Sequence, residues 1–116
     1  MPRLIGMARA KELIFTGRVI DGEQALALGM VDHVVAANDT RDAASKRSYQ
    51  LAQEIAGQAP IALRAAKRAI REGVQLDMDG AMEVERACYG EVIPTSDRIE
   101  GLRAFVEKRA PKYRGE

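Results

Sequence analysis

The sequence predicts a mainly α-helical fold with one short strand. Alanine and long straight-chain residues dominate its 116 positions and aromatic residues make up only 4%, a composition that favours helix over sheet. Apolar residues also recur along most of the chain at the three- and four-residue spacing of amphipathic helices. Hydrophobic residues at 47% and charged residues at 30% are ordinary for a globular protein and exclude wholesale disorder.

The N-terminal part predicts two helices. The first spans residues 5–16, and Gly17 supplies its stop. Asp21 stands at the N-cap position of the second, and Gln24 three residues later completes a capping box. We expect this second helix to end at Gly29.

The segment 30–35, with the sequence MVDHVV, is the one convincing strand because it is short and rich in β-branched residues. A lone strand leaves its backbone donors and acceptors unpaired, and nothing else in the chain reads as a partner strand. Two interpretations stay open: either the segment packs as extended coil, or its sheet lies outside this polypeptide.

The remaining sequence predicts four longer helices, over residues 38–57, 60–73, 77–93 and 95–109. Their starts are marked by side chains that cap helices or by a proline that fits a first turn: Asn38 or Asp39, Pro60, Asp77, and Thr95 or Ser96. Pro111 ends the last helix, and the tail 112–116 is expected to be loose.

Composition and charge narrow the function classes. Eighteen basic residues against seventeen acidic ones leave a net charge of +1, which offers no whole-protein field for steering onto nucleic acid or an anionic membrane. The single cysteine, Cys88, excludes an internal disulfide, and with only one histidine, His33, a zinc site is not expected. No apolar run approaches the roughly 20 residues of a membrane span. The expectation is a soluble, reduced, intracellular protein.

Few side chains are candidates for catalysis. His33 is the one conventional general base near neutral pH, but no nucleophile lies beside it, and we interpret it as a partly exposed histidine at a strand end. Cys88 is interpreted as a small buried residue rather than a nucleophile. Four glutamates of the predicted helices are interpreted as surface charges: Glu83, Glu85, Glu100 and Glu107.

Two basic groupings are stronger candidates for binding. The members of the first follow one another at sequence offsets of zero, three, four and seven, so they share one face of the predicted helix: Arg64, Lys67, Arg68 and Arg71. Such a stripe either binds phosphates or is the solvated back of a helix, and the second interpretation is preferred. The second grouping lies near the C-terminus beside Tyr113: Lys108, Arg109, Lys112 and Arg114. There, anion binding and simple compensation of the helix dipole are equally supported by the residues.

Three blocks of the sequence resemble the enoyl-CoA hydratase (crotonase) family. The first, residues 2–35, has IG before a helix, AKEL within it, TGR after it, and an Ala-x-x-x-Gly-x-Val pattern leading to the predicted strand. The second is QAPIALRAAK at 58–67, and the third is IPTSDRIEGLRAFVEKRAPKY at 93–113. The likeness is greatest to the methylglutaconyl-CoA hydratase branch that also binds AU-rich RNA, which ACY at 87–89 suits.

The resemblance implies a lyase that adds water to α,β-unsaturated acyl-CoA thioesters in fatty-acid or leucine breakdown. In that chemistry two glutamates activate water and two backbone N–H groups hold the thioester oxyanion. Family members carry these groups upstream of the position that matches Pro2, inside a spiral of ββα units. No catalytic or metal-binding residue is therefore assigned, and this span alone is expected to be inactive.

The resemblance also implies a division of the chain and two site residues. Residues 1–37 would be the end of the crotonase core, and residues 38–116 the C-terminal helical trimerisation region, which covers the CoA and builds a trimer or a dimer of trimers. Tyr89 matches an aromatic position near the CoA, and Lys108 matches a lysine close to the CoA phosphates. Phe105 is expected to pack at a helix interface. No separate cofactor is expected, because coenzyme A is part of the substrate.

Two other functions remain open beside the interpretation as part of a hydratase. The chain could be a non-catalytic helical assembly module, or an RNA-binding module. RNA binding is not favoured, because the stripe from Arg64 to Arg71 has no interleaved aromatic residues on which bases could stack. No membrane partner is expected. The resemblance implies the mitochondrial matrix for a eukaryotic protein and the cytoplasm for a bacterial one.

Overall fold

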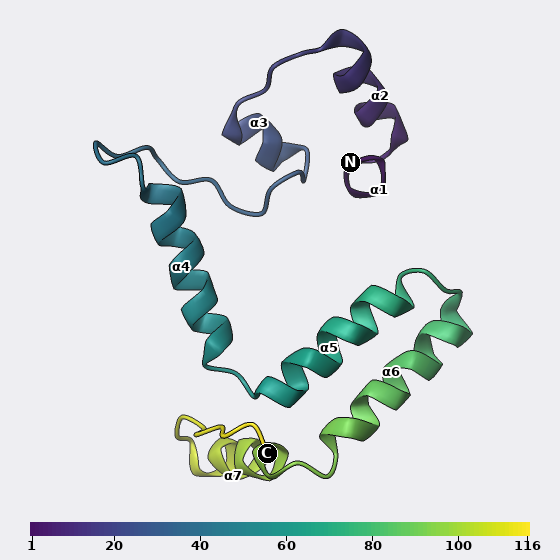
Figure 1. The fold of residues 1–116 in the computed structure, drawn as a ribbon, viewed down its shortest axis with the longest axis vertical. Helices are drawn as coiled ribbons and strands as arrows, with labels where there is room; N and C mark the ends of the chain where they lie inside the picture. Colours follow the sequence, from purple (N-terminus) through teal and green to yellow (C-terminus); the bar gives the residue numbers. More distant parts are fainter. The chain divides into compact units, whose positions relative to one another are not determined.

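The structure, a computed structural model, describes residues 1–116 and consists of helices joined by turns and coil (Figure 1). The chain divides into two compact units, Met1–Tyr49 and Gln50–Glu116. The helices are α1 (Pro2–Ile5), α2 (Met7–Thr16), α3 (Gly22–Ala27), α4 (Ala43–Ala56), α5 (Pro60–Gly73), α6 (Met78–Val92) and α7 (Ser96–Glu107).

The first unit begins with two helices where one was predicted. Gly6, with φ 84°, separates α1 from α2, and a positive φ of this size is readily adopted only by glycine. Gly17 ends α2 in the left-handed conformation, as predicted. The capping box of α3 is also confirmed: Asp21 Oδ1 accepts a hydrogen bond from Gln24 N at 2.8 Å, and Gln24 Oε1 accepts one from Asp21 N at 3.0 Å.

The predicted strand at 30–35 is absent, so the predicted fold class is wrong in this respect. The structure is helical without strands, and the segment is coil with both Val31 and Val35 exposed. The physical reason is that a strand is stabilised by hydrogen bonds to a neighbouring strand, and this chain supplies none. A trimerisation region, which the fold class also included, is likewise not shown by the structure.

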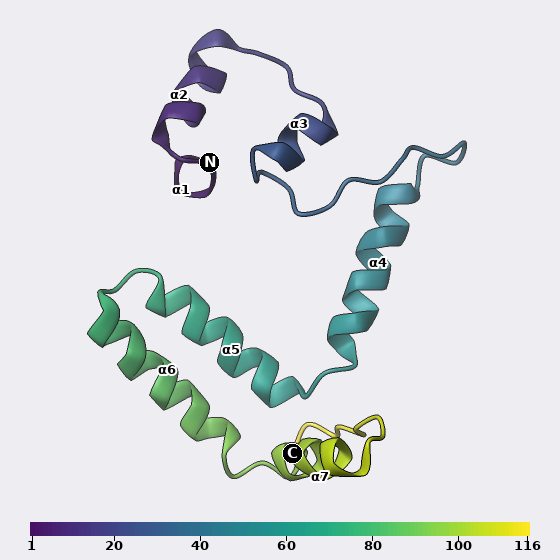
Figure 2. The ribbon, with the colours of Figure 1, turned by 180° about the vertical axis from the view of Figure 1, so that it is seen from behind.

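The second unit is built around the hairpin of α5 and α6, which lie side by side in both views (Figure 1 and Figure 2). Pro60 occupies the first turn of α5 as predicted, where its missing N–H costs no helical hydrogen bond. Asp77 caps α6 as predicted, because its Oδ1 accepts a hydrogen bond from Gly80 N at 2.9 Å. Small side chains, including Ala65 and Cys88, are buried where the two helices meet.

The boundaries of α4 and α7 differ from the predicted ones. The helix α4 begins at Ala43 rather than near Asn38, whose Oδ1 instead accepts a hydrogen bond from Asp42 N at 3.0 Å ahead of the helix. Thr95 is the N-cap of α7, since its Oγ1 accepts a hydrogen bond from Arg98 N at 3.2 Å. The helix ends at Glu107, two residues before the predicted end.

Few apolar side chains are buried within this chain. The buried ones are mostly small: Ile5, Ala10, Ala65, Cys88 and Ala104. Large apolar residues on the helices stay exposed, such as Phe15 at 79% and Phe105 at 84%. The helices therefore present apolar faces that their own unit leaves uncovered. None of the helices has both the length and the apolar character needed to span a membrane.

Candidate functional site

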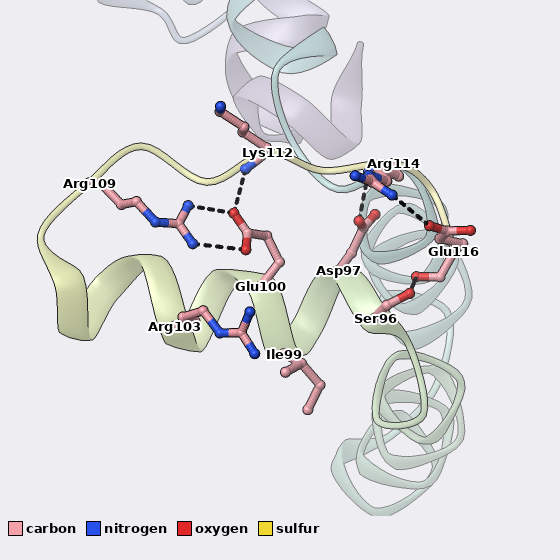
Figure 3. A pocket seen from close by; sticks show the side chains of 9 residues that line it. All are labelled: Ser96, Asp97, Ile99, Glu100, Arg103, Arg109, Lys112, Arg114 and Glu116. Atoms are coloured by element: carbon pink, nitrogen blue, oxygen red, sulfur yellow. Dashed lines mark hydrogen bonds and ion pairs between the residues drawn. The ribbon is translucent and has the colours of Figure 1, made fainter.

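The C-terminal tail folds back along α7 and is held there by a buried carboxylate (Figure 3). Asp97, only 3% exposed, accepts hydrogen bonds from Arg114 N at 2.7 Å on Oδ1 and from Gly115 N at 2.8 Å on Oδ2. Hydrogen bonds to an ionised carboxylate are among the stronger ones in proteins. Asp97 lies in the first turn of α7, where a negative charge is also favoured by the helix dipole.

Glu116 adds two hydrogen bonds between the tail and the start of α7. The main-chain oxygen of Glu116 accepts hydrogen bonds from Asp97 N at 3.0 Å and from Ser96 Oγ at 2.9 Å. It thereby satisfies one of the N–H groups that a helix N-terminus leaves without a partner. The prediction of a loose tail is wrong, because backbone groups at three of its last residues are bonded to the start of α7.

Glu100, one turn after Asp97, holds the middle of the tail. Its carboxylate accepts two hydrogen bonds from the Arg109 guanidinium, Nη1–Oε1 at 2.6 Å and Nη2–Oε2 at 3.0 Å, and one from Lys112 N at 2.8 Å. Arg109 also donates from Nε to Glu107 Oε2 at 2.6 Å. The two glutamates interpreted as solvent-facing charges therefore form a clamp on Arg109.

The hydrogen bonds from the Arg109 guanidinium, together with the one from the Lys112 backbone N–H, lower the pKa of Glu100 to about 2. Because the folded value lies below the ordinary 4.5, the stabilisation from ionised Glu100 is complete above about pH 4.5 and is lost as the pH falls towards 2. We expect the Glu100 side-chain carboxyl carbon to titrate near pH 2 by NMR. In Arg109→Ala the midpoint should move up towards 4.5; a midpoint near 4.5 in the unmodified chain would contradict the clamp.

Lys108 lies at the turn between α7 and the tail. It is the C-cap residue in the left-handed conformation, with φ 52° and ψ 40°, and its N–H donates to the carbonyl oxygens of Ala104 and Phe105. Its ammonium group is exposed and has no hydrogen-bond or ion-pair partner. Phe105, three residues earlier, is exposed in this chain, and its packing at a helix interface stays a prediction. The last turn and C-cap of α7 therefore carry both an unpaired ammonium group and an exposed aromatic ring.

The tail and α7 enclose a hollow of about 580 Å³ whose charges nearly cancel. Its lining residues are Ser96, Asp97, Ile99, Glu100, Arg103, Arg109, Lys112, Arg114 and Glu116 (Figure 3). Arg109 is occupied by the two glutamates, and Arg114 Nη1 lies 3.9 Å from Glu116 Oε1. Lys108 is not part of this lining, and its ammonium group meets no acidic group.

Tyr89 lies elsewhere in the same unit. It projects from α6, is 56% exposed, and lines an apolar groove of about 590 Å³ between α5 and α6. Small residues of α5, among them Ala66 and Ala69, form the opposite wall. The structure therefore places the two predicted site residues, Tyr89 and Lys108, in different surroundings, and both assignments stay predictions.

The other candidates are not assembled into a site. Cys88 is buried as expected, and its Sγ accepts a hydrogen bond from Arg68 Nε at 3.2 Å. Arg68 also pairs with Glu91 at 2.6 Å, so the basic stripe has one of its cations engaged. All four residues of the stripe line a hollow of about 320 Å³ together with Glu72. His33 is exposed in coil, and no cluster of acidic, histidine or cysteine residues could hold a metal ion.

Comparison with known proteins decides the family. A family model described as enoyl-CoA hydratase/isomerase matches residues 1–116, which is the whole chain. The chain belongs to the enoyl-CoA hydratase/isomerase family. The resemblance seen in the sequence blocks is thereby confirmed.

Individual members of the enoyl-CoA hydratase/isomerase family show how much of the fold the chain represents. It is 50% identical to human mitochondrial methylglutaconyl-CoA hydratase over 116 residues, which are 100% of this chain and 34% of that protein. It is 54% identical to mouse mitochondrial enoyl-CoA hydratase domain-containing protein 2 over 115 residues, 99% of this chain and 39% of that protein. The chain thus spans a little over a third of the length of these relatives.

A solved structure of the enoyl-CoA hydratase/isomerase family confirms the fold. The crystal structure of enoyl-CoA hydratase from Bacillus anthracis superposes with a TM-score of 0.90 at 46% identity, over 99% of this chain and 43% of that chain. The helical arrangement described above is therefore a segment of the crotonase fold.

Sequence reasoning missed the clamp on Arg109. No local signal could have found it, because Glu100 and Arg109 are separated by a chain reversal that no local pattern predicts.

Proposed function

We propose that this chain is the C-terminal part of an enoyl-CoA hydratase that adds water to α,β-unsaturated acyl-CoA thioesters in fatty-acid or leucine breakdown. Support comes from membership of the enoyl-CoA hydratase/isomerase family and from 50% identity to a methylglutaconyl-CoA hydratase. In the reaction, water supplies a hydroxyl group to the β-carbon and a proton to the α-carbon. No residue here is assigned to that step. We propose that the chain contributes CoA contacts and oligomerisation, and that it has no turnover alone.

The observation that carries this proposal is the free Lys108 ammonium together with the exposed Phe105 ring three residues before it at the same helix end. Coenzyme A has phosphate groups that accept hydrogen bonds from an ammonium and an adenine ring that can stack on an aromatic side chain. Tyr89, also exposed and aromatic, is proposed as a second contact for this extended ligand. Phosphate binding by Lys108 would not be opposed by a nearby free carboxylate, because Glu100 and Glu107 are both bonded to Arg109.

We also propose that the protein acts as a homo-oligomer, a trimer or a dimer of trimers. The exposed apolar faces of the helices support association, since exposed apolar surface of this kind marks interaction sites. The proposed compartment is the mitochondrial matrix for a eukaryotic protein, supported by the mitochondrial relatives, and the cytoplasm for a bacterial one, supported by the bacterial structure.

The experiment is the Lys108→Ala substitution in the intact gene product, assayed for hydration of crotonyl-CoA. We expect KM to rise about tenfold, the loss of one charge-assisted hydrogen bond, with kcat changed by less than about twofold. A rise in KM alone is the signature of a binding interaction made equally in the ground state and the transition state.

The matched control is Lys11→Ala, which removes an exposed lysine of α2 that no proposed contact uses. It should leave both kinetic constants unchanged. An unchanged KM in Lys108→Ala would remove Lys108 from the site, and a fall in kcat with constant KM would point to a different role.

A further inference from the structure

Lys108 occupies a backbone conformation that disfavours it. Its φ of 52° puts it in the left-handed region, where the Cβ of an L-residue crowds the following carbonyl oxygen and where glycine is the usual residue at a helix C-terminus. Arg41 is the other residue besides glycine with a positive φ in this chain. A non-glycine residue keeps such a conformation when the surrounding structure holds it there, often at a functional site.

The groups that hold this turn are on both of its sides. Before it, Ala104 accepts the backbone N–H of Arg109 at 3.0 Å as well as that of Lys108. After it, Glu100 binds the side chain of Arg109 and the backbone N–H of Lys112. One carboxylate on α7 therefore fixes the residue directly after Lys108 and the chain four residues after it.

The same carboxylate is prevented from competing for the Lys108 ammonium. Its two oxygens accept three hydrogen bonds from the tail, and its side chain is only 20% exposed. Counting Glu100 and Glu107 against Lys108, Arg109 and Lys112, the turn keeps one net positive charge. The clamp engages the Arg109 guanidinium and the Lys112 backbone N–H, and it leaves the ammonium groups of Lys108 and Lys112 free.

From this geometry we propose that Glu100 is a positioning residue, which clamps the chain reversal through Arg109 and Lys112 and so presents the Lys108 ammonium to the phosphate groups of acyl-CoA. This inference rests on the proposed function of Lys108. Glu100 itself touches no substrate. Its action is to fix the direction of a neighbouring side chain, so its removal should weaken binding and leave the chemical step intact.

The test is a double-mutant cycle in the intact gene product, with coenzyme A as the probe in calorimetry and crotonyl-CoA as the substrate in kinetics. Glu100→Gln keeps an acceptor for Lys112 N but loses the charged fork on Arg109. We expect it to weaken binding about fivefold and to raise KM with kcat unchanged. In a Lys108→Ala background the same substitution should have no further effect, because the residue on which Glu100 acts is gone.

Two further variants test whether the effect on binding is specific to the pair of Glu100 and Arg109. Arg109→Lys keeps the positive charge but loses the bidentate geometry, so it should weaken binding in the same direction even if Glu100→Gln folds poorly. Glu91→Gln breaks a carboxylate–arginine pair outside the clamp, with Arg68 at 2.6 Å, and should leave binding unchanged.

The outcomes separate the two proposals. The positioning role is overturned if Lys108→Ala weakens the binding of coenzyme A and Glu100→Gln does not. It is also overturned if Glu100→Gln weakens this binding by the same factor with and without Lys108. In both cases the phosphate contact of Lys108 stands. If Lys108→Ala has no effect on binding, the proposed site itself fails, and the positioning role fails with it.

Discussion

Replacing Asp97 with alanine should release the C-terminal tail from α7 and lower the free energy of unfolding by about 2 to 3 kcal/mol. The carboxylate is buried and receives two backbone N–H groups, from Arg114 and Gly115, at 2.7 and 2.8 Å. Each hydrogen bond to a charged group contributes roughly 1.5 to 3 kcal/mol, and the two share one side chain, so their sum is not expected in full. Urea denaturation followed by circular dichroism measures the change.

Hydrogen exchange shows whether the loss is at the tail. In Asp97→Ala the amide protons of Arg114 and Gly115 should exchange faster, while those in the middle of α5 keep their protection. Asp39→Ala is the matched control, because Asp39 is exposed in a turn and its replacement should change the stability by less than about 0.5 kcal/mol. Unchanged protection of both tail amides in Asp97→Ala would show that the carboxylate does not hold the tail.

Lys108→Gly should change stability and binding in opposite directions. Glycine adopts the left-handed conformation without the Cβ clash, so the substitution should raise the free energy of unfolding by about 1 kcal/mol. It also removes the ammonium, so the affinity for coenzyme A should fall about tenfold. A gain in stability together with a loss of affinity is expected if Lys108 serves binding at the expense of stability. It is not expected if Lys108 serves to stabilise the fold.

Comparison with two other variants separates the effects. Lys108→Ala should lose binding equally but gain no stability, because alanine keeps the Cβ clash. Arg41→Gly, at φ 54° in the other unit, should gain stability without losing binding. Thermal unfolding and calorimetry on the same samples give both quantities. If Lys108→Gly were no more stable than the parent protein, the conformation at this position would carry no cost.

Local signals in the sequence predicted the parts of the fold that depend on neighbouring residues. The capping box of Asp21 and Gln24 and the cap at Asp77 are interactions over three positions, and each was found as expected. The proline start of α5 is likewise a property of its own first turn. Helix ends such as Glu107 were less accurate, because fraying and chain reversal there depend on contacts outside the helix.

The failures were at positions whose structure depends on distant groups. The segment 30–35 has strand propensity, but no partner strand exists in the chain to realise it. The tail has no hydrophobic pattern, yet Asp97 and Glu100, three positions apart on one face of α7, bind its amides. For the site, composition identified the basic C-terminal grouping, but only the structure shows that Arg109 is engaged and Lys108 is free.

The hydrogen bonds between α7 and the tail also bear on how this part of the chain folds. They join residues between 9 and 20 positions apart, from Glu100 with Arg109 to Ser96 with Glu116. Closing loops of this length takes roughly tens to hundreds of nanoseconds, and chains with such local contacts fold quickly. We therefore expect the last 22 residues to reach their helix-and-tail arrangement early, before the apolar faces of the other helices find their partners.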